Sequence, residues 1–160
     1  MVGATSPVKE NNEWSTPDWF YNYFNNIYQF KVDLAANRYN SKCISHYDKA
    51  LDSLIQDWHL IDGWCWLNPP YGRHLHEWIE KAYHEMQLGA KIIMLIPAST
   101  GTSYWAKWIW NKVPKIYFIE GRIRFVDPLS KTTDPPKYDS AVIVFQVDLI
   151  VYIQNVNLFH

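Results

Sequence analysis

The sequence lacks the features of a secreted or membrane-anchored protein. It has only two cysteines, Cys43 and Cys65, which form neither a CxxC pair nor a disulfide framework. It shows no signal peptide, no apolar run long enough to cross a bilayer and no lipidation motif. We therefore expect this chain to work in a reducing cytoplasm, without a membrane partner.

A strong net charge is also missing. The formal charge is −1 at pH 7, which excludes the global basic field of a nucleic-acid coat protein. The charge is nevertheless uneven. Residues 1–62 carry five Lys/Arg against eight Asp/Glu, whereas residues 107–137 carry seven against three. A surface that faces phosphates is therefore expected in the second half of the chain.

Length and aromatic content favour one globular domain. The chain has 160 residues, 48% of them hydrophobic and 17% aromatic, and it contains no internal repeat or low-complexity segment. Core packing explains most of the nine Trp and eleven Tyr residues, and some of them are available for stacking. The polar residues 1–13 are expected to form a flexible N-terminal arm, and residues 14–160 a single domain.

Three segments have the apolar spacing of helices. The first is expected to begin after Ser15 or Thr16, either of which could cap it, and to end near Gln29. Its predicted apolar face consists of Trp19, Phe20, Tyr23, Phe24 and Ile27. The second runs from Leu75 until Gly89 stops it, and the third passes through residues 105–109. Residues 48–55 also have helical spacing.

Short apolar runs between these helices predict strands. They cover residues 30–34, 63–67, 91–97, 115–119 and 141–145, with residues 150–153 as a candidate edge strand. Strands that alternate with helices predict a three-layer α/β domain with a mixed, mainly parallel sheet. No helix separates the last strands, so one of them should be antiparallel. Only nineteen residues separate Asp33 from Asp52, so the fold should be abbreviated between the first and central strands.

The loop after the central strand, Asn68-Pro69-Pro70-Tyr71, is the most informative stretch. The two prolines fix two φ angles and remove two N–H donors, which leaves carbonyl acceptors turned outward. A side-chain amide precedes them and an aromatic ring follows. A rigid set of acceptors beside a stacking surface suits a planar ligand that carries an amino group.

Other polar residues are less specific. Asp33, at the end of a strand, could accept from ligand hydroxyl or ammonium groups, or it could cap the next helix. His74, His76 and His84 have metal-compatible side chains but no convincing spacing, and no metal site is expected.

Five motifs, taken together, resemble those of one family. In chain order they are Trp14-Ser15-Thr16-Pro17, Val32-Asp33-Leu34-Ala35-Ala36, Asn68-Pro69-Pro70-Tyr71-Gly72, Leu95-Ile96-Pro97-Ala98 and Gly121-Arg122-Ile123-Arg124-Phe125. The set is similar to that of the small phage-type DNA N6-adenine methyltransferases, which use S-adenosyl-L-methionine. The resemblance implies a Rossmann-like methyltransferase domain in the cytoplasm of a bacterium or a phage-infected host.

The resemblance also implies roles for the central loop. The Asn68 side-chain oxygen and the Pro69 carbonyl would accept the two hydrogens of the adenine amine. Pro70 would complete the rigid loop that holds these acceptors. Tyr71 would stack on the adenine, which must be flipped out of the duplex. Positioning and acceptor dipoles would carry the catalysis without a strong general base.

Cofactor contacts follow from the resemblance as well. The residues implied are Ser15, Thr16 and Pro17 beside the methionine part, Asp33 and Ala35 at the first strand's end, Asp52 at the adenine ring, and Asn68. The sequence departs from the wider pattern because it contains no F-x-G-x-G. The acid that holds the ribose is therefore unassigned, with Asp48 as a candidate.

For DNA, no separate target-recognition domain fits into this length, so recognition would come from loops 98–103 and 121–139. Arg122 and Arg124 would read guanine or clamp phosphate, although a solvated arginine pair explains them equally well. Arg73 is a candidate phosphate contact.

Three alternatives remain open on the sequence. The same chemistry could act on another amine, in a protein glutamine or an RNA base. The chain could also be a non-catalytic aromatic-rich module that binds nucleic acid or carbohydrate, or an inactive relative that still binds the cofactor.

Overall fold

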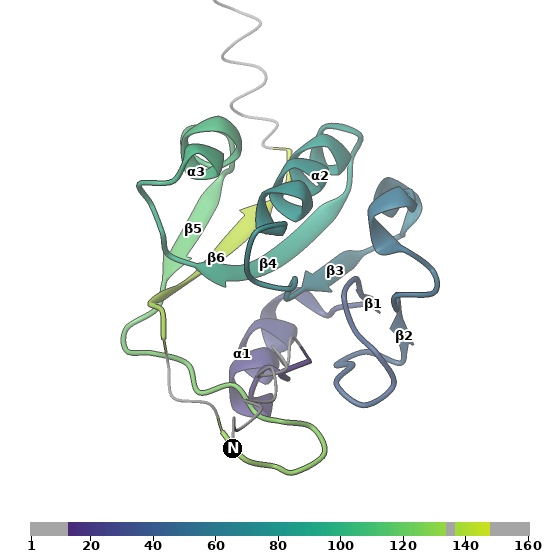
Figure 1. Ribbon diagram of the computed structural model, residues 1–160. Coiled ribbons are helices and arrows are strands. Elements are labelled where there is room, and N and C mark those ends of the chain that lie inside the picture. The colour runs from purple at the N-terminus through teal and green to yellow at the C-terminus, as the bar shows by residue number, and fades with distance from the viewer. Residues whose placement is uncertain (1–12, 134–136, 148–160) are drawn as a thin grey trace, which may run out of the picture.

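We describe a computed structural model of the chain, which covers residues 13–133 and 137–147. Within these residues a six-stranded sheet has the order β2-β1-β3-β4-β6-β5 (Figure 1). The strands are β1 (Val32–Asp33), β2 (Ser45–His46), β3 (Trp64–Leu67), β4 (Lys91–Pro97), β5 (Lys115–Phe118) and β6 (Ser140–Phe145). The expected arm, apart from Glu13, and the candidate edge strand at 150–153 lie outside the described residues.

The sheet is mixed, as predicted. β2, β1, β3 and β4 pair in parallel, whereas β6 is antiparallel to both of its neighbours, β4 and β5. β5 therefore runs in the same direction as β4. The carboxyl ends of all strands except β6 meet at one edge of the sheet.

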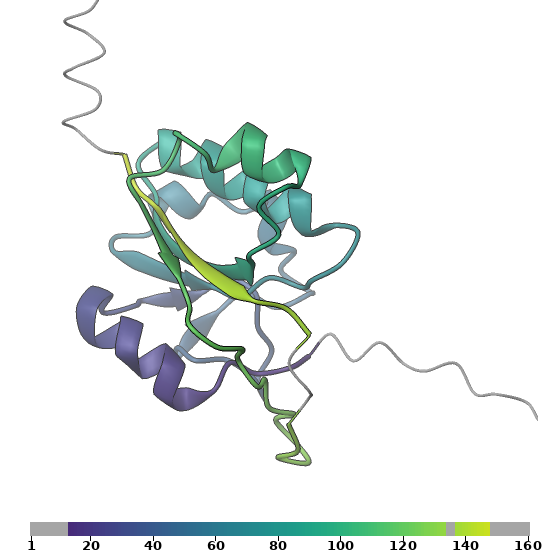
Figure 2. The same cartoon turned by 90° about the vertical axis from the view of Figure 1, so that its left-hand side faces the viewer.

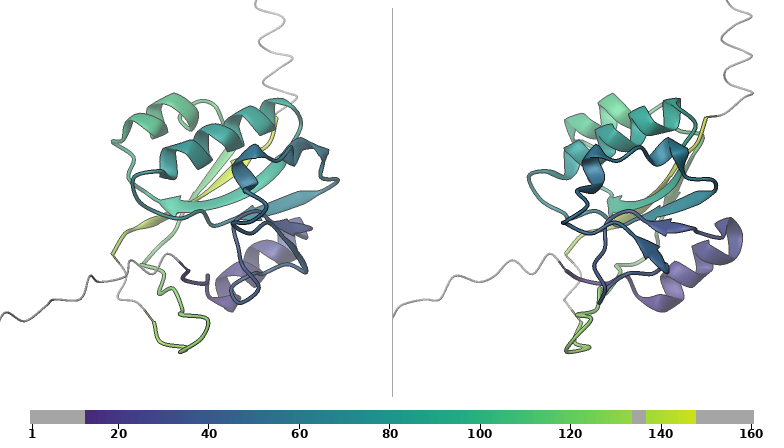
Figure 3. Two further views of the ribbon diagram at one scale, coloured as in Figure 1. Left: turned by 45° about the vertical axis from the view of Figure 1, so that its right-hand side comes forward. Right: turned by 90° about the vertical axis from the view of Figure 1, so that its right-hand side faces the viewer.

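Helices cover both faces of the sheet (Figures 2 and 3). They are α1 (Asp18–Tyr28) on one face, and α2 (Leu75–Gln87) and α3 (Ser103–Trp108) on the other. In β4, Ile92 and Met94 face the α2 side, and Ile93 faces the α1 side. β4 is buried on both faces, which explains its unbroken apolar sequence. The predicted three-layer α/β fold is confirmed.

The start and the buried face of α1 differ from the prediction. Pro17 occupies the N-cap position, and no side chain forms a capping hydrogen bond, so the expected Ser15 or Thr16 cap is wrong. Tyr21 is buried, because its ring packs edge-on against Trp66 at 5.4 Å.

The contact between Tyr21 and Trp66 rotates α1 about its own axis, so the buried face differs from the predicted one. Phe20 and Phe24 are buried as expected, but the other three residues of the predicted face, Trp19, Tyr23 and Ile27, are exposed. The rotation depends on a contact across the sheet, which the spacing within the helix does not reveal.

The connection from β1 to β3 is abbreviated, as predicted, but its details are different. It contains no α-helix, only β2 and the two 3-10 turns η1 (Ser53–Ile55) and η2 (Trp58–Leu60). Asp48 Oδ1 accepts from the N–H groups of Ala50 and Leu51, both at 3.0 Å, as a helix N-cap would. The helical spacing at 48–55 nevertheless does not produce an α-helix, because Asp52 adopts a left-handed conformation with a φ of 47° and interrupts the run. The two-residue strand β2 was not predicted.

No helix in the described part of the chain is long and apolar enough to span a bilayer.

Candidate active site

The chain reverses its direction of travel across the sheet between β1 and β3. From β1 it continues to β2 on one side, and it then returns to form β3 on the other side. Open α/β sheets bind ligands in the crevice at such a switch point, beyond the carboxyl ends of the strands. Asp33 pairs with Trp66, and the Leu34 N–H donates to the Trp66 carbonyl at 2.9 Å. The residues that follow β1 therefore lie beside the loop at 68–71.

Asn68 joins this loop to the segment before α1. Its side-chain Nδ2 donates to Thr16 Oγ1 at 3.2 Å, and Thr16 itself is buried. The bond fixes the orientation of the amide and leaves Oδ1 as the atom that can accept from a ligand. Pro69 is buried and Pro70 is exposed, so the loop is anchored at one proline and open at the next.

Tyr71 is held at both ends. Its hydroxyl donates to the Leu95 carbonyl of β4 at 3.3 Å, and its ring meets Phe125 edge-on at 6.0 Å and 88°. Burial raises the pKa of the Tyr71 phenol, which keeps the hydroxyl protonated as a donor. The Tyr71 ring is thus fixed at the end of the loop at 68–71.

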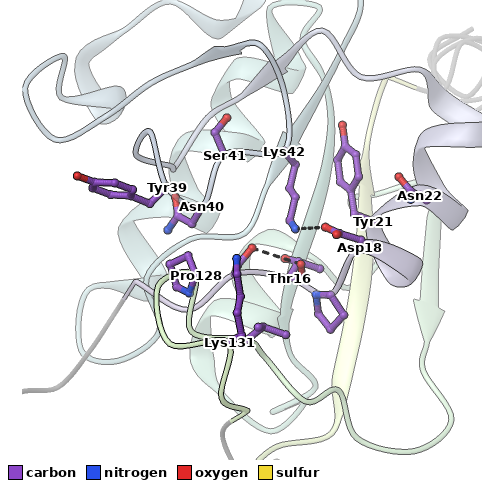
Figure 4. A pocket seen from close by; sticks show the side chains of 13 residues that line it. Thr16, Asp18, Tyr21, Asn22, Tyr39, Asn40, Ser41, Lys42, Pro128 and Lys131 are labelled. Carbon is purple, nitrogen blue, oxygen red and sulfur yellow. Dashed lines mark hydrogen bonds and ion pairs between the residues drawn. The ribbon is translucent and has the colours of Figure 1, made fainter.

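A pocket of about 500 Å³ opens next to Thr16 (Figure 4). Its lining comes from the start of α1, from residues 39–42 and from residues 126–131. The lining residues are Ser15, Thr16, Pro17, Asp18, Tyr21, Asn22, Tyr39, Asn40, Ser41, Lys42, Val126, Pro128 and Lys131. The volume lies within the range of about 300–1,000 Å³ usual for small-molecule sites.

Charges of both signs line this pocket. Lys42 Nζ donates to Asp18 Oδ1 at 2.6 Å, and Figure 4 shows the two side chains pointing toward each other. The hydrogen bond and the charge of Lys42, with a further contribution from Lys131, lower the pKa of Asp18. The pocket therefore offers a carboxylate and ammonium groups to a ligand that carries both charges.

Asp33 builds one wall of the pocket without lining it. The side chain is only 3% exposed, and its two oxygens accept from the N–H groups of Ala35 at 3.3 Å and Lys42 at 3.0 Å. Burial raises the pKa of Asp33 to about 6, although these two hydrogen bonds act in the opposite direction. Asp33 thus holds residues 35–42 in place through their backbone.

The predicted cofactor-binding residues fall into three groups. Ser15, Thr16 and Pro17 line the pocket, and the hydrogen bond to Asn68 joins them to the loop at 68–71. Asp33 and Ala35 lie behind the pocket wall. Asp52, by contrast, does not line this pocket; it is exposed, precedes η1 and has a φ of 47°.

The three predicted DNA contacts are all exposed. Arg73 lies two residues after Tyr71, the last residue of the loop at 68–71. Arg122 and Arg124 flank the buried Ile123, so exposure alternates along this segment. Arg122 Nε donates to Asp139 Oδ1 at 3.0 Å, an ion pair that the sequence did not indicate.

Several pocket residues were missed by sequence reasoning. Tyr39, Lys42 and Lys131 lie in loops that have no periodic pattern, and no local signal identifies them. Asp18 lines the pocket as well, but an acidic residue at the start of a helix is common and gives no signal of a binding site.

One group of metal-compatible side chains lies elsewhere. Oxygen or nitrogen atoms of Asp57, His59 and Glu85 lie within 4.8 Å of one another. Glu85 Oε2 accepts from the His59 backbone N–H at 2.8 Å, and Oε1 accepts from Lys81 Nζ. The protein's own donors therefore occupy this carboxylate, at the end of α2 away from the loop at 68–71.

Comparison with known proteins decides the family. The model of the DNA N-6-adenine-methyltransferase (Dam) family matches residues 3–157. The chain belongs to this family. It is an adenine-specific DNA methyltransferase, and the resemblance that the five motifs suggested is confirmed. The alternatives of another amine substrate and of a binding module are not supported.

Two phage proteins are similar to this methyltransferase. The DNA N-6-adenine-methyltransferase of Haemophilus phage HP1 (strain HP1c1) is 24% identical over 150 residues, which cover 91% of this chain and 85% of the relative. That of Escherichia phage T1 is 30% identical over 106 residues, or 66% of this chain and 44% of the relative. The match to the T1 protein thus spans less than half of that protein.

Proposed function

We propose that the enzyme transfers a methyl group from S-adenosyl-L-methionine to the N6 amine of an adenine that is flipped out of DNA into a pocket at residues 68–71. The observation that carries this proposal is the hydrogen bond from Asn68 Nδ2 to Thr16 Oγ1 at 3.2 Å. It joins a loop of acceptors to the wall of a pocket large enough for a cofactor.

The acceptors act on the amine of the target base. The lone pair of an adenine amine is delocalised into the ring, so this nitrogen is a poor nucleophile. Asn68 Oδ1 and the Pro69 carbonyl accept its two hydrogens and draw the nitrogen toward tetrahedral geometry. Preorganised acceptors of this kind need no reorganisation during the reaction. The methylated amine is a strong acid and loses its proton to water.

Tyr71 supplies the stacking face for the flipped base. Phe125 supports its ring from one side, and the bond to Leu95 fixes its hydroxyl. A ring with so little freedom loses little entropy when the base stacks on it. Pro70 adds a fixed φ angle between Tyr71 and the acceptors.

The pocket suits the zwitterionic methionine end of the cofactor, which supplies an electrophilic methyl group on a sulfonium. Ser15, Thr16 and Pro17 form one side, and Lys42 and Asp18 offer partners for its carboxylate and ammonium groups. Asp33 and Ala35 position the opposite wall through their hydrogen bond.

The adenosine end is assigned to the region that follows β2. Asp52 remains the proposed contact to its adenine ring. Asp48 remains the candidate for the ribose, since only its Oδ1 is used in the turn with Ala50 and Leu51.

Recognition of DNA is assigned to loops of the one catalytic domain at residues 14–160. Arg73 and Arg124 are exposed beside the site and available to phosphates or bases. Arg122 would exchange its partner Asp139 for DNA. Loops 98–103 and 121–139 complete this surface.

The test uses cofactor with a labelled methyl group, incubated with DNA, RNA or protein. We expect label in DNA alone, recovered as N6-methyladenine after digestion. Calorimetric titration with the cofactor is the parallel measurement. Label only in RNA or protein, or no cofactor binding, would overturn the proposal.

A further inference from the structure

A long stretch around α3 and β5 is free of acidic residues. Between Glu85 and Glu120 the sequence contains no Asp or Glu, but it contains four lysines. These are Lys91, Lys107, Lys112 and Lys115. All four lysines are exposed, but Lys91 and Lys115 begin β4 and β5, at the edge of the sheet away from Asn68. Lys107, in α3, and Lys112, just after it, are the two cations of this stretch that could attract a polyanion to the α3 side.

Two aromatic rings are exposed within this stretch. Trp110 is 39% exposed and Phe118 57% exposed, with 6.4 Å between their ring centroids. Both pack against the fully buried Trp105, at 5.1 Å for Trp110 and 6.1 Å for Phe118. Phe118 and Trp105 are nearly parallel, at 13°. The two outer rings thus form a supported aromatic platform.

The platform lies at the edge of the sheet that carries the catalytic loop. Phe118 is the last residue of β5, which runs in the same direction as β3 and β4 (Figure 1). Trp110 Nε1 donates to the carbonyl of Thr100, in the loop that follows β4, at 3.5 Å. Three strand spacings separate β5 from β3. That is roughly 14 Å at about 4.8 Å per strand.

This separation is similar to the width of a DNA major groove, about 12 Å. A duplex bound with an adenine at Asn68 would need to extend only this far across the sheet edge to reach the platform. The acids at its border are Glu120, two residues after Phe118, and Asp139, which Arg122 neutralises at 3.0 Å. Lys107, Lys112 and Arg122 together outnumber these two acids, so the surface complements DNA in charge.

Resting on the proposed function, we propose that Trp110 and Phe118 stack on an unpaired base of the bound DNA beside the flipped adenine. Flipping breaks a base pair and so creates such a base. Stacking on an aromatic side chain is tolerant of sequence, because every base has a π-face. The platform would thereby stabilise the opened DNA without reading its sequence.

The test compares two labelled duplexes of the same sequence, one fully paired and one with a single unpaired base, by fluorescence anisotropy at fixed salt. We expect the unchanged enzyme to bind the second duplex about tenfold more tightly, within the range that base–aromatic stacking supports. The double variant Trp110→Ala/Phe118→Ala should lose this preference and keep the weaker binding that the lysines provide.

Phe118→Leu separates stacking from folding, because leucine still covers Trp105 but has no π-face. We expect it to reduce the preference, whereas Phe118→Tyr keeps it. The matched control is Leu88→Ala, since Leu88 is 64% exposed but lies at the opposite edge of the sheet. Melting temperature and cofactor titration verify that each variant is folded.

The stacking proposal would be overturned if the folded double variant still preferred the duplex with the unpaired base. It would also be overturned if the wild-type enzyme bound both duplexes equally. The methyl-transfer assay on DNA separates this result from a failure of the proposed function. An enzyme that methylates adenine but shows no preference refutes the platform alone.

Discussion

The two walls of the site are built differently. The loop at 68–71 follows β3, which pairs with β4 over four residues, and β4 pairs with β6 over six. The opposite wall, residues 34–42, follows β1, which pairs over only two residues with each neighbour. The first wall is positioned by a continuous backbone ladder. The second is positioned by the Asp33 carboxylate.

The difference matches the roles that we propose. Acceptors that bend an amine toward its reactive geometry lose much of their effect when they move by about 1 Å. A wall that only contacts a large cofactor tolerates more movement. The extended part of the sheet therefore supports the chemistry, and the abbreviated part supports binding.

The largest effect on turnover should come from a substitution in the loop at 68–71, the wall that the backbone ladder of β3 and β4 positions. Asn68→Ala removes one acceptor of the amine and should reduce kcat by about 10²- to 10³-fold, as the loss of one preorganised group does elsewhere. Cofactor affinity should stay within a few-fold. Single-turnover methyl transfer and calorimetry measure the two effects. Asn26→Ala, on the exposed side of α1, is the matched control. Near-normal turnover of the Asn68 variant would refute its role.

The wall at residues 34–42, which the Asp33 carboxylate positions, should make the stability of the fold depend on pH. The pKa of Asp33 is raised to about 6 in the folded state, from 3.8, so the protonated form favours folding. The stabilisation that protonated Asp33 gives the folded state is complete below about pH 4 and is lost as pH rises through about 6. It amounts to roughly 3 kcal/mol at 1.36 kcal/mol per pKa unit.

Asp33→Asn removes this titration. The difference in unfolding free energy between the two proteins should therefore change by about 3 kcal/mol between pH 4 and pH 7, and it should favour the variant more at high pH. Urea denaturation at several pH values measures it. Parallel profiles for the two proteins would show that Asp33 does not titrate in this range.

A smaller effect is expected at the mouth of the pocket. Lys42→Met keeps the length of the side chain but removes its charge, and it should weaken cofactor binding about tenfold, as expected for a lost charged hydrogen bond. Saturating cofactor should restore kcat. Lys49→Met is the control, because Lys49 is 91% exposed and lies outside the pocket lining. A lowered kcat at saturation would instead place Lys42 in the chemical step.

The smallest effect is expected for Tyr71→Phe. The variant loses the hydrogen bond to the Leu95 carbonyl, at about 1 kcal/mol of stability, and keeps the stacking ring. Turnover should remain within a few-fold, whereas Tyr71→Ala should lower it at least tenfold. A Phe variant as inactive as the Ala variant would show that the hydroxyl contributes to catalysis.

The part of the molecule around β3, β4 and α2 was largely predictable from the sequence. β4 is buried on both faces, so its apolar run identifies it, and the prolines at 69 and 70 mark the loop after β3. The ends of α2 are also local signals, with Gly89 just after the helix. In each case the information lies within a few neighbouring residues.

The part that contains α1, residues 34–55 and the pocket wall was not predictable in the same way. The fold of residues 34–55 depends on bonds from Asp33 and Asp48 side chains to the backbone. The face of α1 depends on the contact between Tyr21 and Trp66, forty-five residues apart. The pocket wall brings Lys42 and Lys131 together from distant loops. None of these contacts has a periodic signature.

The antiparallel strand β6 has a consequence for how such an enzyme can change its target. Because β5 and β6 run in opposite directions, the connection from Phe118 to Ser140 leaves and re-enters the sheet at the edge where Asn68 lies. On the proposed assignment of DNA recognition to this connection, insertions or deletions in it would alter the surface presented to DNA without shifting the register of β3 and β4. A new recognition sequence could then be acquired by changing the length of one loop, while the atoms that we propose to hold the amine stay where they are.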